Sequence, residues 1–138
     1  MLGVDVNQGQ IADDAGNNPK GTVAIGGSGI TVTYTQSVQT AIRVQIQAPG
    51  GEASGSGGSS YRWCATLAGA KAGETKTETV LWNQFWGGVT DSTQGCWNNG
   101  GVNPPTGQLI EQVSINIPGG NTTDLPFGFC LLSIGQAS

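Results

Sequence analysis

Hydrophobic and polar residues alternate with a period of two along much of the chain. In residues 29–37, 40–48 and 108–118, Ile, Val and Tyr side chains alternate with Thr, Arg, Gln, Ser and Asn side chains. A period of two places the apolar side chains on one face of an extended strand and the polar side chains on the other. Each segment is therefore predicted to be a half-buried antiparallel strand with one face toward water.

At least four further segments have the composition of strands, because they are rich in β-branched and aromatic residues and lie between clusters of Gly, Pro and Asn. They span residues 21–27, 60–67, 75–82 and 126–134. No longer segment has the 3.6-residue period of a helix, and the best candidate is interrupted by Gly69 and Gly73. The sequence therefore predicts an all-β fold, an antiparallel β-sandwich.

The chain of 138 residues is predicted to form a single domain, residues 1–138. Residues 48–60 have the Gly and Ser composition of a linker, but neither side is long enough for its own core. We therefore predict a long loop between two strands there. The first residues lack the charged and apolar regions of a signal peptide, and we expect the chain to be one module of a longer protein.

Charged residues make up 10% of the chain, against about 25% in typical soluble proteins. The surface is therefore predicted to consist of uncharged hydrogen-bonding residues. Five basic residues and a net charge of -4 argue against nucleic acid as a partner. No apolar run is long enough to span a membrane. The absence of histidine excludes histidine-based acid–base catalysis, a Ser-His-Asp triad and most zinc sites.

Two of the predicted strands have polar faces rich in amide side chains. Amide and guanidinium groups suit vicinal sugar hydroxyls, which are both donors and acceptors of hydrogen bonds. If the two strands share a sheet, these side chains form one hydrogen-bonding band. The alternative is an ordinary solvated sheet face. The residues concerned are Arg43, Gln45, Gln47, Gln112, Ser114 and Asn116.

Aromatic residues suggest a second set of contacts. The alternation in residues 60–67 places Tyr61 and Trp63 on the face opposite Cys64, so both rings point outward if Cys64 faces the core. A displayed aromatic ring offers a rigid apolar face that suits the C–H face of a pyranose. We therefore expect Tyr61 and Trp63 to stack on sugar rings; the alternative is that they fill the core.

Three of the four tryptophans lie within residues 81–99, which are otherwise rich in Gly, Asn, Thr and Gln. Trp86 and Trp97 lie among glycines and asparagines, a composition typical of loops. An indole in such a loop either folds back into the core or is displayed. We expect Trp86 and Trp97 to be displayed and to contact a sugar.

The nine acidic residues allow an enzyme as an alternative, because a glycosidase needs two carboxyl groups about 5–10 Å apart in a cleft. None of the six candidates lies in the apolar strand context of a catalytic acid; they are Asp13, Asp14, Glu52, Asp91, Glu111 and Asp124. Asp13, Asp14 and Asn17 lie in one turn-like segment. Carboxylate and amide oxygens of this kind hold Ca²⁺, so we predict a structural calcium site there, with an ordinary turn as the alternative.

Three cysteines without a CxxC spacing favour one disulfide and one buried free thiol over a metal site. Such a disulfide indicates an exported protein. The alternative is three reduced cysteines in the core.

Motifs spread over residues 61–134 resemble a known family. They are "YRWCATL", "LWNQF", "CWNNGG" and "IEQVSINIPGGNTTDLPFGFCLLSI". These motifs resemble the ends of secreted bacterial enzymes that degrade plant polysaccharides and of their carbohydrate-binding modules. The chain is similar to carbohydrate-binding module family 81, in which a module is attached to an endoglucanase.

The resemblance implies a jelly-roll β-sandwich that is not an enzyme and binds β-glucan through surface aromatics, sometimes with structural calcium. The glucans are cellulose, cello-oligosaccharides, xyloglucan and mixed-linked glucan. It also implies secretion and an attached glycoside hydrolase that the module directs to plant cell walls. A small glycosidase and a protein-interaction or adhesion β-sandwich are the alternatives.

Applied residue by residue, the resemblance implies a disulfide between Cys96 and Cys130, with Cys64 facing the core. It also implies structural roles for Trp82 and Phe85. The loop at residues 86–95 is longer than the family pattern, so the resemblance does not fix the role of the tryptophan at its start.

Overall fold

The computed structural model describes residues 2–5, 21–49, 61–89, 100–117 and 127–138. In these residues the chain forms ten strands, and every pair of these strands is antiparallel. The prediction of an all-β, antiparallel protein is confirmed. No helix of the described residues is long and apolar enough to cross a membrane.

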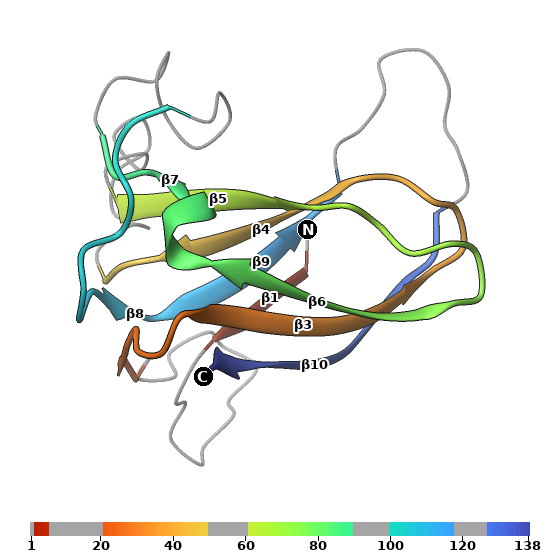
Figure 1. The fold of residues 1–138 in the computed structure, drawn as a ribbon, viewed down its shortest axis with the longest axis horizontal. Coiled ribbons are helices and arrows are strands. Elements are labelled where there is room, and N and C mark those ends of the chain that lie inside the picture. The colour runs from red at the N-terminus through yellow and green to blue at the C-terminus, as the bar shows by residue number, and fades with distance from the viewer. Residues whose placement is uncertain (1, 6–20, 50–60, 90–99, 118–126) are drawn as a thin grey trace, which may run out of the picture.

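The strands of the described residues form three sheets (Figure 1). The five-stranded sheet has the order β1 (Leu2–Asp5), β9 (Gln112–Asn116), β4 (Ile42–Gln47), β5 (Arg62–Leu67) and β7 (Trp86–Gly87). The three-stranded sheet has the order β10 (Phe129–Ala137), β3 (Gly29–Gln36) and β6 (Thr75–Leu81). A short pair joins β2 (Val23–Ala24) to β8 (Leu109–Ile110), and a 3₁₀ turn, η2 (Trp82–Gln84), follows β6.

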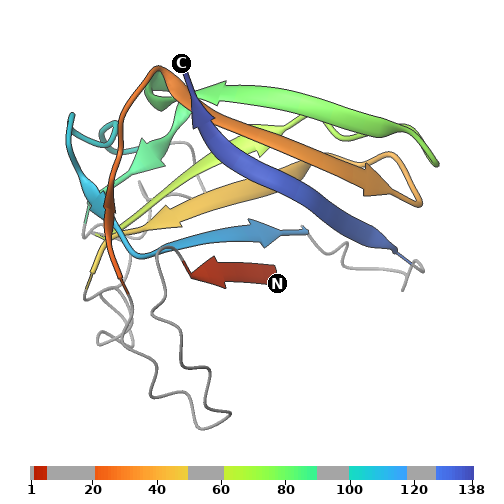
Figure 2. The same ribbon diagram turned by 90° about the horizontal axis from the view of Figure 1, so that it is seen from below.

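The two larger sheets are connected by three chain segments that each contribute one strand to each sheet. These segments are β3 with β4, β5 with β6, and β9 with β10. In one sheet β4 pairs with both β5 and β9, and in the other β3 pairs with both β6 and β10. Figure 2 shows the three-stranded sheet lying over the five-stranded sheet. The same three segments are therefore neighbours in both sheets.

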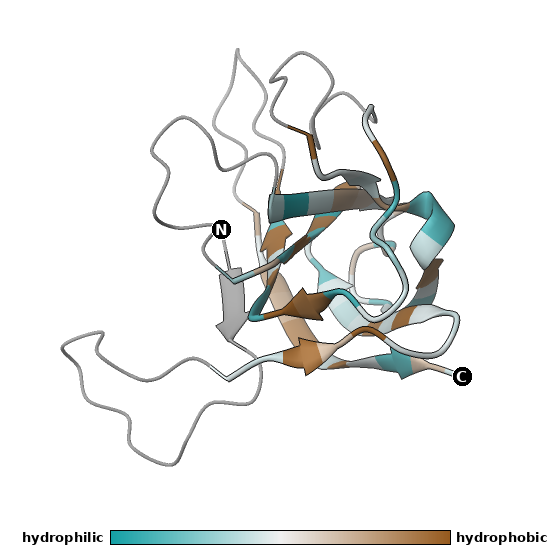
Figure 3. Ribbon diagram, turned by 90° about the vertical axis from the view of Figure 1, so that its left-hand side faces the viewer, coloured by the Kyte–Doolittle hydropathy of each residue, from teal (hydrophilic) through white to brown (hydrophobic). Residues whose placement is uncertain are grey.

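One hydrophobic core takes side chains from both sheets, and the alternation seen in the sequence is responsible. Figure 3 shows that hydrophobic and hydrophilic residues occur along the same strands. The apolar residues of β3, β4 and β9 are buried in the core that both sheets share. The central core residues are Ile30, Val32 and Tyr34 of β3, Ile42, Val44 and Ile46 of β4, and Val113 and Ile115 of β9.

A buried tyrosine and a glutamate join β3 to β6. Tyr34 is fully buried and its hydroxyl donates to Glu78 Oε1. Glu78 also accepts from the backbone N–H groups of Ala68 at 3.0 Å and Gly69 at 3.3 Å, and lies 3.3 Å from Lys76 Nζ. Burial and the adjacent carboxylate raise the pKa of Tyr34 far above its usual range. Burial alone would raise the pKa of Glu78, but its hydrogen bonds and Lys76 outweigh burial and lower the pKa.

Acid should weaken the folded state through Glu78. Because folding lowers the pKa of Glu78, its stabilising contribution is present above the unfolded-state pKa and is lost as pH falls through the folded-state pKa. We expect the free energy of unfolding to fall below about pH 4, and to fall less in Glu78→Gln. Denaturant unfolding at neutral and acidic pH measures this. The exposed Glu74→Gln is the matched control; an equal effect in both variants would contradict the assignment to Glu78.

Candidate functional site

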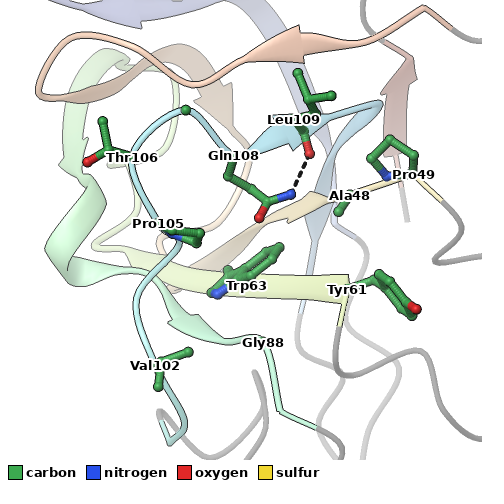
Figure 4. Close-up of a pocket in the computed structure, with 11 residues that line it drawn as sticks. Ala48, Pro49, Tyr61, Trp63, Gly88, Val102, Pro105, Thr106, Gln108 and Leu109 are labelled. Carbon is green, nitrogen blue, oxygen red and sulfur yellow. Dashed lines mark hydrogen bonds between the residues drawn. The ribbon is translucent and has the colours of Figure 1, made fainter.

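An open groove of about 680 Å³ lies where the end of β4, the start of β5 and the segment leading into β8 meet (Figure 4). We call it the aromatic groove. Its volume lies within the roughly 300–1,000 Å³ of known ligand pockets. Its lining includes Tyr61, Trp63, Val102, Thr106, Gln108 and Leu109.

One wall of the groove is held in place by hydrogen bonds to β7 and to the turn before it. Val102 and Gly87 exchange two backbone hydrogen bonds, with N···O distances of 2.9 and 3.2 Å. The Nδ2 of Asn103 donates to the backbone oxygens of Asn83 at 3.1 Å and Phe85 at 2.7 Å. The wall is therefore fixed by contacts within the chain, so a ligand need not order it.

Exposed hydrophobic side chains gather in the aromatic groove. Tyr61 is 43% exposed, Val102 54% and Leu109 48%. They are three of the seven exposed large hydrophobic residues in the part of the chain that the structure describes. Apolar side chains that gather in a concave place mark a ligand site, whereas single exposed ones carry no such meaning.

The groove also offers hydrogen-bonding groups and no charge. The Nε2 of Gln108 donates to the backbone oxygen of Leu109 at 2.8 Å, which holds the carboxamide above Trp63 (Figure 4). Its Oε1 and the hydroxyls of Tyr61 and Thr106 form no hydrogen bond among the described residues. No described residue that lines the groove is charged. The groove therefore suits a neutral ligand with apolar faces and hydroxyl edges.

Trp63 forms the floor of the groove from inside the core. It is 5% exposed and lies opposite Ile46 of β4 and Gly87 of β7. The prediction that Trp63 points outward is wrong. Cys64 is buried as well, but on the other face of β5, so a buried cysteine does not imply an exposed tryptophan beside it. Tyr61 is exposed, as predicted.

Gly88 covers the edge of the Trp63 indole. A Cβ added at Gly88 would lie 2.6 Å from Trp63 Nε1, and the φ of Gly88 is 67°. Both the close approach and the left-handed backbone require glycine at this position. The Nε1 of Trp63 is buried without a hydrogen-bond partner among the described residues.

The predicted polar band exists, but most of it is buried. The register pairs Arg43 with Asn116, Gln45 with Ser114, and Gln47 with Gln112, so all six residues share one face of the five-stranded sheet. Gln45, Gln47, Ser114 and Asn116 are at most 6% exposed. The expectation of a solvated face is therefore wrong at these four positions. Only Arg43 and Gln112 are half-buried, and their contact with a ligand stays a prediction.

Gln47 uses both ends of its carboxamide inside the protein. Its Oε1 accepts from Arg62 Nε at 3.1 Å, and its Nε2 donates to Glu111 Oε1 at 3.2 Å. Glu111 is itself buried and also donates its backbone N–H to the backbone oxygen of Gln47 at 2.9 Å. This part of the predicted band stabilises the sheet rather than facing a ligand.

The other aromatic residues divide between core and surface. Phe85 is fully buried and stacks obliquely on Trp82, with ring centroids 5.5 Å apart. Trp82 Nε1 donates to the backbone oxygen of Gly26 at 3.0 Å. The structural roles expected for these two residues are confirmed. Trp86, predicted to lie in a loop, begins β7 and is half-buried; Trp97 lies outside the described residues.

The cysteines do not pair as the family resemblance implies. Cys130 lies on β10 and is an exposed free thiol, so the Cys96–Cys130 disulfide is wrong. Cys64, expected to be a core residue without a disulfide, is disulfide-bonded. Cys130 and Cys64 belong to different sheets, opposite Thr35 and Gln45 respectively. Cys96 lies outside the described residues.

The predicted calcium ligands Asp13, Asp14 and Asn17 also lie outside the described residues, and the site stays a prediction. Within the described ranges, no group of three His, Cys, Asp or Glu side chains could hold a metal ion.

Comparison with protein-family models, with curated proteins and with solved structures finds no match to this chain.

The wall of the groove was not predicted from the sequence. Val102, Thr106, Gln108 and Leu109 come from a Pro- and Gly-rich connection that reads as an ordinary turn. The one local signal is Leu109, an apolar residue directly after that turn on a strand of only two residues. Its partners across the groove are about 45 positions away in the sequence, at the start of β5.

Proposed function

We propose that this protein is a non-catalytic module that binds neutral β-glucan in the aromatic groove. Cellulose chains and cello-oligosaccharides are the first candidates, with xyloglucan and mixed-linked glucan next. The observation that carries the proposal is that the exposed side chains of Tyr61 and Leu109 line the same groove as the uncommitted oxygens of Thr106 and Gln108. A glucosyl ring has an apolar C–H face for the first pair and equatorial hydroxyls for the second.

The shape and neutrality of the groove support an extended, uncharged ligand. An open groove admits a chain that continues at both ends, whereas an enclosed cavity holds a single small molecule. Because no described lining residue is charged, binding should depend little on salt. A phosphate- or uronate-bearing ligand would find no counter-charge among these residues.

The acidic residues of the described chain support a binding role. Glu78 is engaged by Tyr34 and two backbone N–H groups, and Glu111 accepts from Gln47. No described acidic residue lines the aromatic groove. A glycosidase would need a pair of carboxyl groups there.

We further propose that the two larger sheets are the layers of a jelly-roll β-sandwich, and that the protein is secreted. Their shared core and the three connecting segments support the fold. The disulfide at Cys64 supports an oxidising compartment. The family resemblance supports an attached glycoside hydrolase that the module directs to plant cell walls.

Tyr61→Ala should weaken binding of cellohexaose about tenfold, because it removes the exposed ring that stacks on a glucosyl unit. Tyr61→Phe keeps the ring and should lose little. Isothermal titration calorimetry measures the affinity, expected between roughly micromolar and sub-millimolar for the unchanged protein. Leu132→Ala on β10, exposed on the other sheet, is the control.

Two results would contradict the proposal. Release of reducing sugar from soluble glucan would show that the protein is a glycosidase. Unchanged mobility in affinity gels that contain glucan, with no response to xylo-oligosaccharides either, would favour a protein-interaction domain. Thermal unfolding with and without a chelator tests the predicted calcium site, whose loss should lower the thermal stability.

A further inference from the structure

We propose a second sugar site, separate from the aromatic groove, at the edge of the five-stranded sheet. A hollow of about 320 Å³ there is lined by Thr66, Asn83, Gln84 and Trp86; we call it the Trp86 hollow. Its size is near the lower limit of about 300 Å³ for ligand pockets, so it suits one pyranose unit of a neutral glycan. This inference rests on the proposed function, because it assigns a second site to the same class of ligand.

The Trp86 hollow and the aromatic groove lie on opposite sides of β5. In an antiparallel pair, residues directly opposite each other point to the same face. Trp86 is opposite Cys64, so it shares a face with Cys64 and Thr66. Trp63, the floor of the groove, points to the other face. The two sites have no lining residue in common.

The hollow combines an indole with hydrogen-bonding groups that the protein itself does not use. Thr66 and Asn83 are exposed, and their side chains form no hydrogen bond among the described residues. Gln84 Oε1 accepts from the Leu81 N–H at 2.8 Å, which orients the carboxamide and leaves its Nε2 free to donate. The set therefore contains both donors and acceptors beside an apolar ring, as vicinal hydroxyls and a pyranose C–H face require.

The backbone that presents these groups is fixed. Phe85 donates its N–H to the backbone oxygen of Trp82 at 3.2 Å, which closes the turn η2. Asn103 binds the backbone oxygen of Asn83 at 3.1 Å and leaves the Asn83 side chain uncommitted. Arg43 lies opposite Thr66 on β4, on the same face of the sheet. A sugar would thus bind without ordering a loop first.

Two sites make the protein bivalent toward a polymer. A short oligosaccharide should bind at both sites independently. A polysaccharide, or neighbouring chains on a cell wall, should bind more tightly than either site alone, because the second contact becomes intramolecular.

The test is an NMR titration of the full chain with cellotetraose. The indole N–H of Trp86 reports on the hollow, and the backbone amides of Thr106 and Gln108 report on the groove. We expect both sets to shift in the unchanged protein and the Trp86 signal to shift still in Tyr61→Ala. Asn83→Ala, at an exposed position that preserves the indole, should weaken only the binding at the hollow, by about tenfold. Leu132→Ala should behave as the unchanged protein.

Three outcomes separate this inference from the proposed function. Shifts confined to the groove would overturn the second site and leave the function standing. Loss of the Trp86 shift in Tyr61→Ala would overturn it too, since it would show one continuous site. No shift at either place with any glucan would overturn the proposed function, and this inference with it.

Discussion

Trp63→Ala should lower the free energy of unfolding by about 3–5 kcal/mol, the cost of removing a large aromatic side chain from a core. Trp63 is 5% exposed and belongs to the cluster shared by both sheets. Its indole also closes the floor of the aromatic groove. Truncation removes its packing contacts and opens the core to water through the groove. The total free energy of unfolding of a typical domain is only about 5–15 kcal/mol, so this loss is a large part of it.

Trp63→Phe keeps an aromatic ring in the core and removes the indole Nε1. Because Nε1 of Trp63 has no hydrogen-bond partner among the described residues, losing it breaks no bond. We expect Trp63→Phe to retain much of the stability that Trp63→Ala loses. Denaturant unfolding followed by circular dichroism measures both. Tyr61→Ala is the control, since its ring is exposed; if it destabilised the protein as much as Trp63→Ala, the assignment of Trp63 to the core would be wrong.

Breaking the disulfide should cost about 2–5 kcal/mol of stability, because the bond restricts the unfolded chain. Cys64→Ser, or a reducing agent, removes it. Cys130→Ser is the matched control and should leave stability unchanged, because Cys130 is free and exposed. Thermal unfolding with and without reductant compares the three proteins.

Peptide mapping checks the pairing directly. In the native protein, iodoacetamide should modify Cys130. Cys96 is the one remaining cysteine in the chain, so we expect a Cys64–Cys96 disulfide. A Cys130 thiol that resists alkylation until reductant is added would instead restore the pairing implied by the family resemblance.

The strands could be predicted because their signal is local. The alternation in residues 29–37, 40–48 and 60–67 gives β3, β4 and β5 within two residues at either end. Residues 108–118 form two strands rather than one: Glu111 lies between β8 and β9, and the two strands pair in different sheets. The short strands β1 and β7 were not predicted, since four or two residues are too few for a period to be recognised.

The candidate site was predicted only in part. Tyr61 is exposed and the polar residues of β4 and β9 share a face, as the alternation indicates. The burial of Gln45 and Gln47 was not predictable, since a period of two says which residues share a face but not whether that face is covered. The outward orientation predicted for Trp63 was wrong for the same reason, because both faces of β5 are buried where Trp63 lies.

The sequence by itself determined the antiparallel all-β class, the absence of histidine chemistry and the low charge that suits a neutral ligand. Each is a property of composition or of neighbouring residues. Only the tertiary structure decided which cysteine is bonded, which aromatic forms a floor and which is displayed, and where the groove lies. Those depend on residues far apart in the chain, such as Tyr61 and Leu109, which only strand pairing and sheet packing bring together.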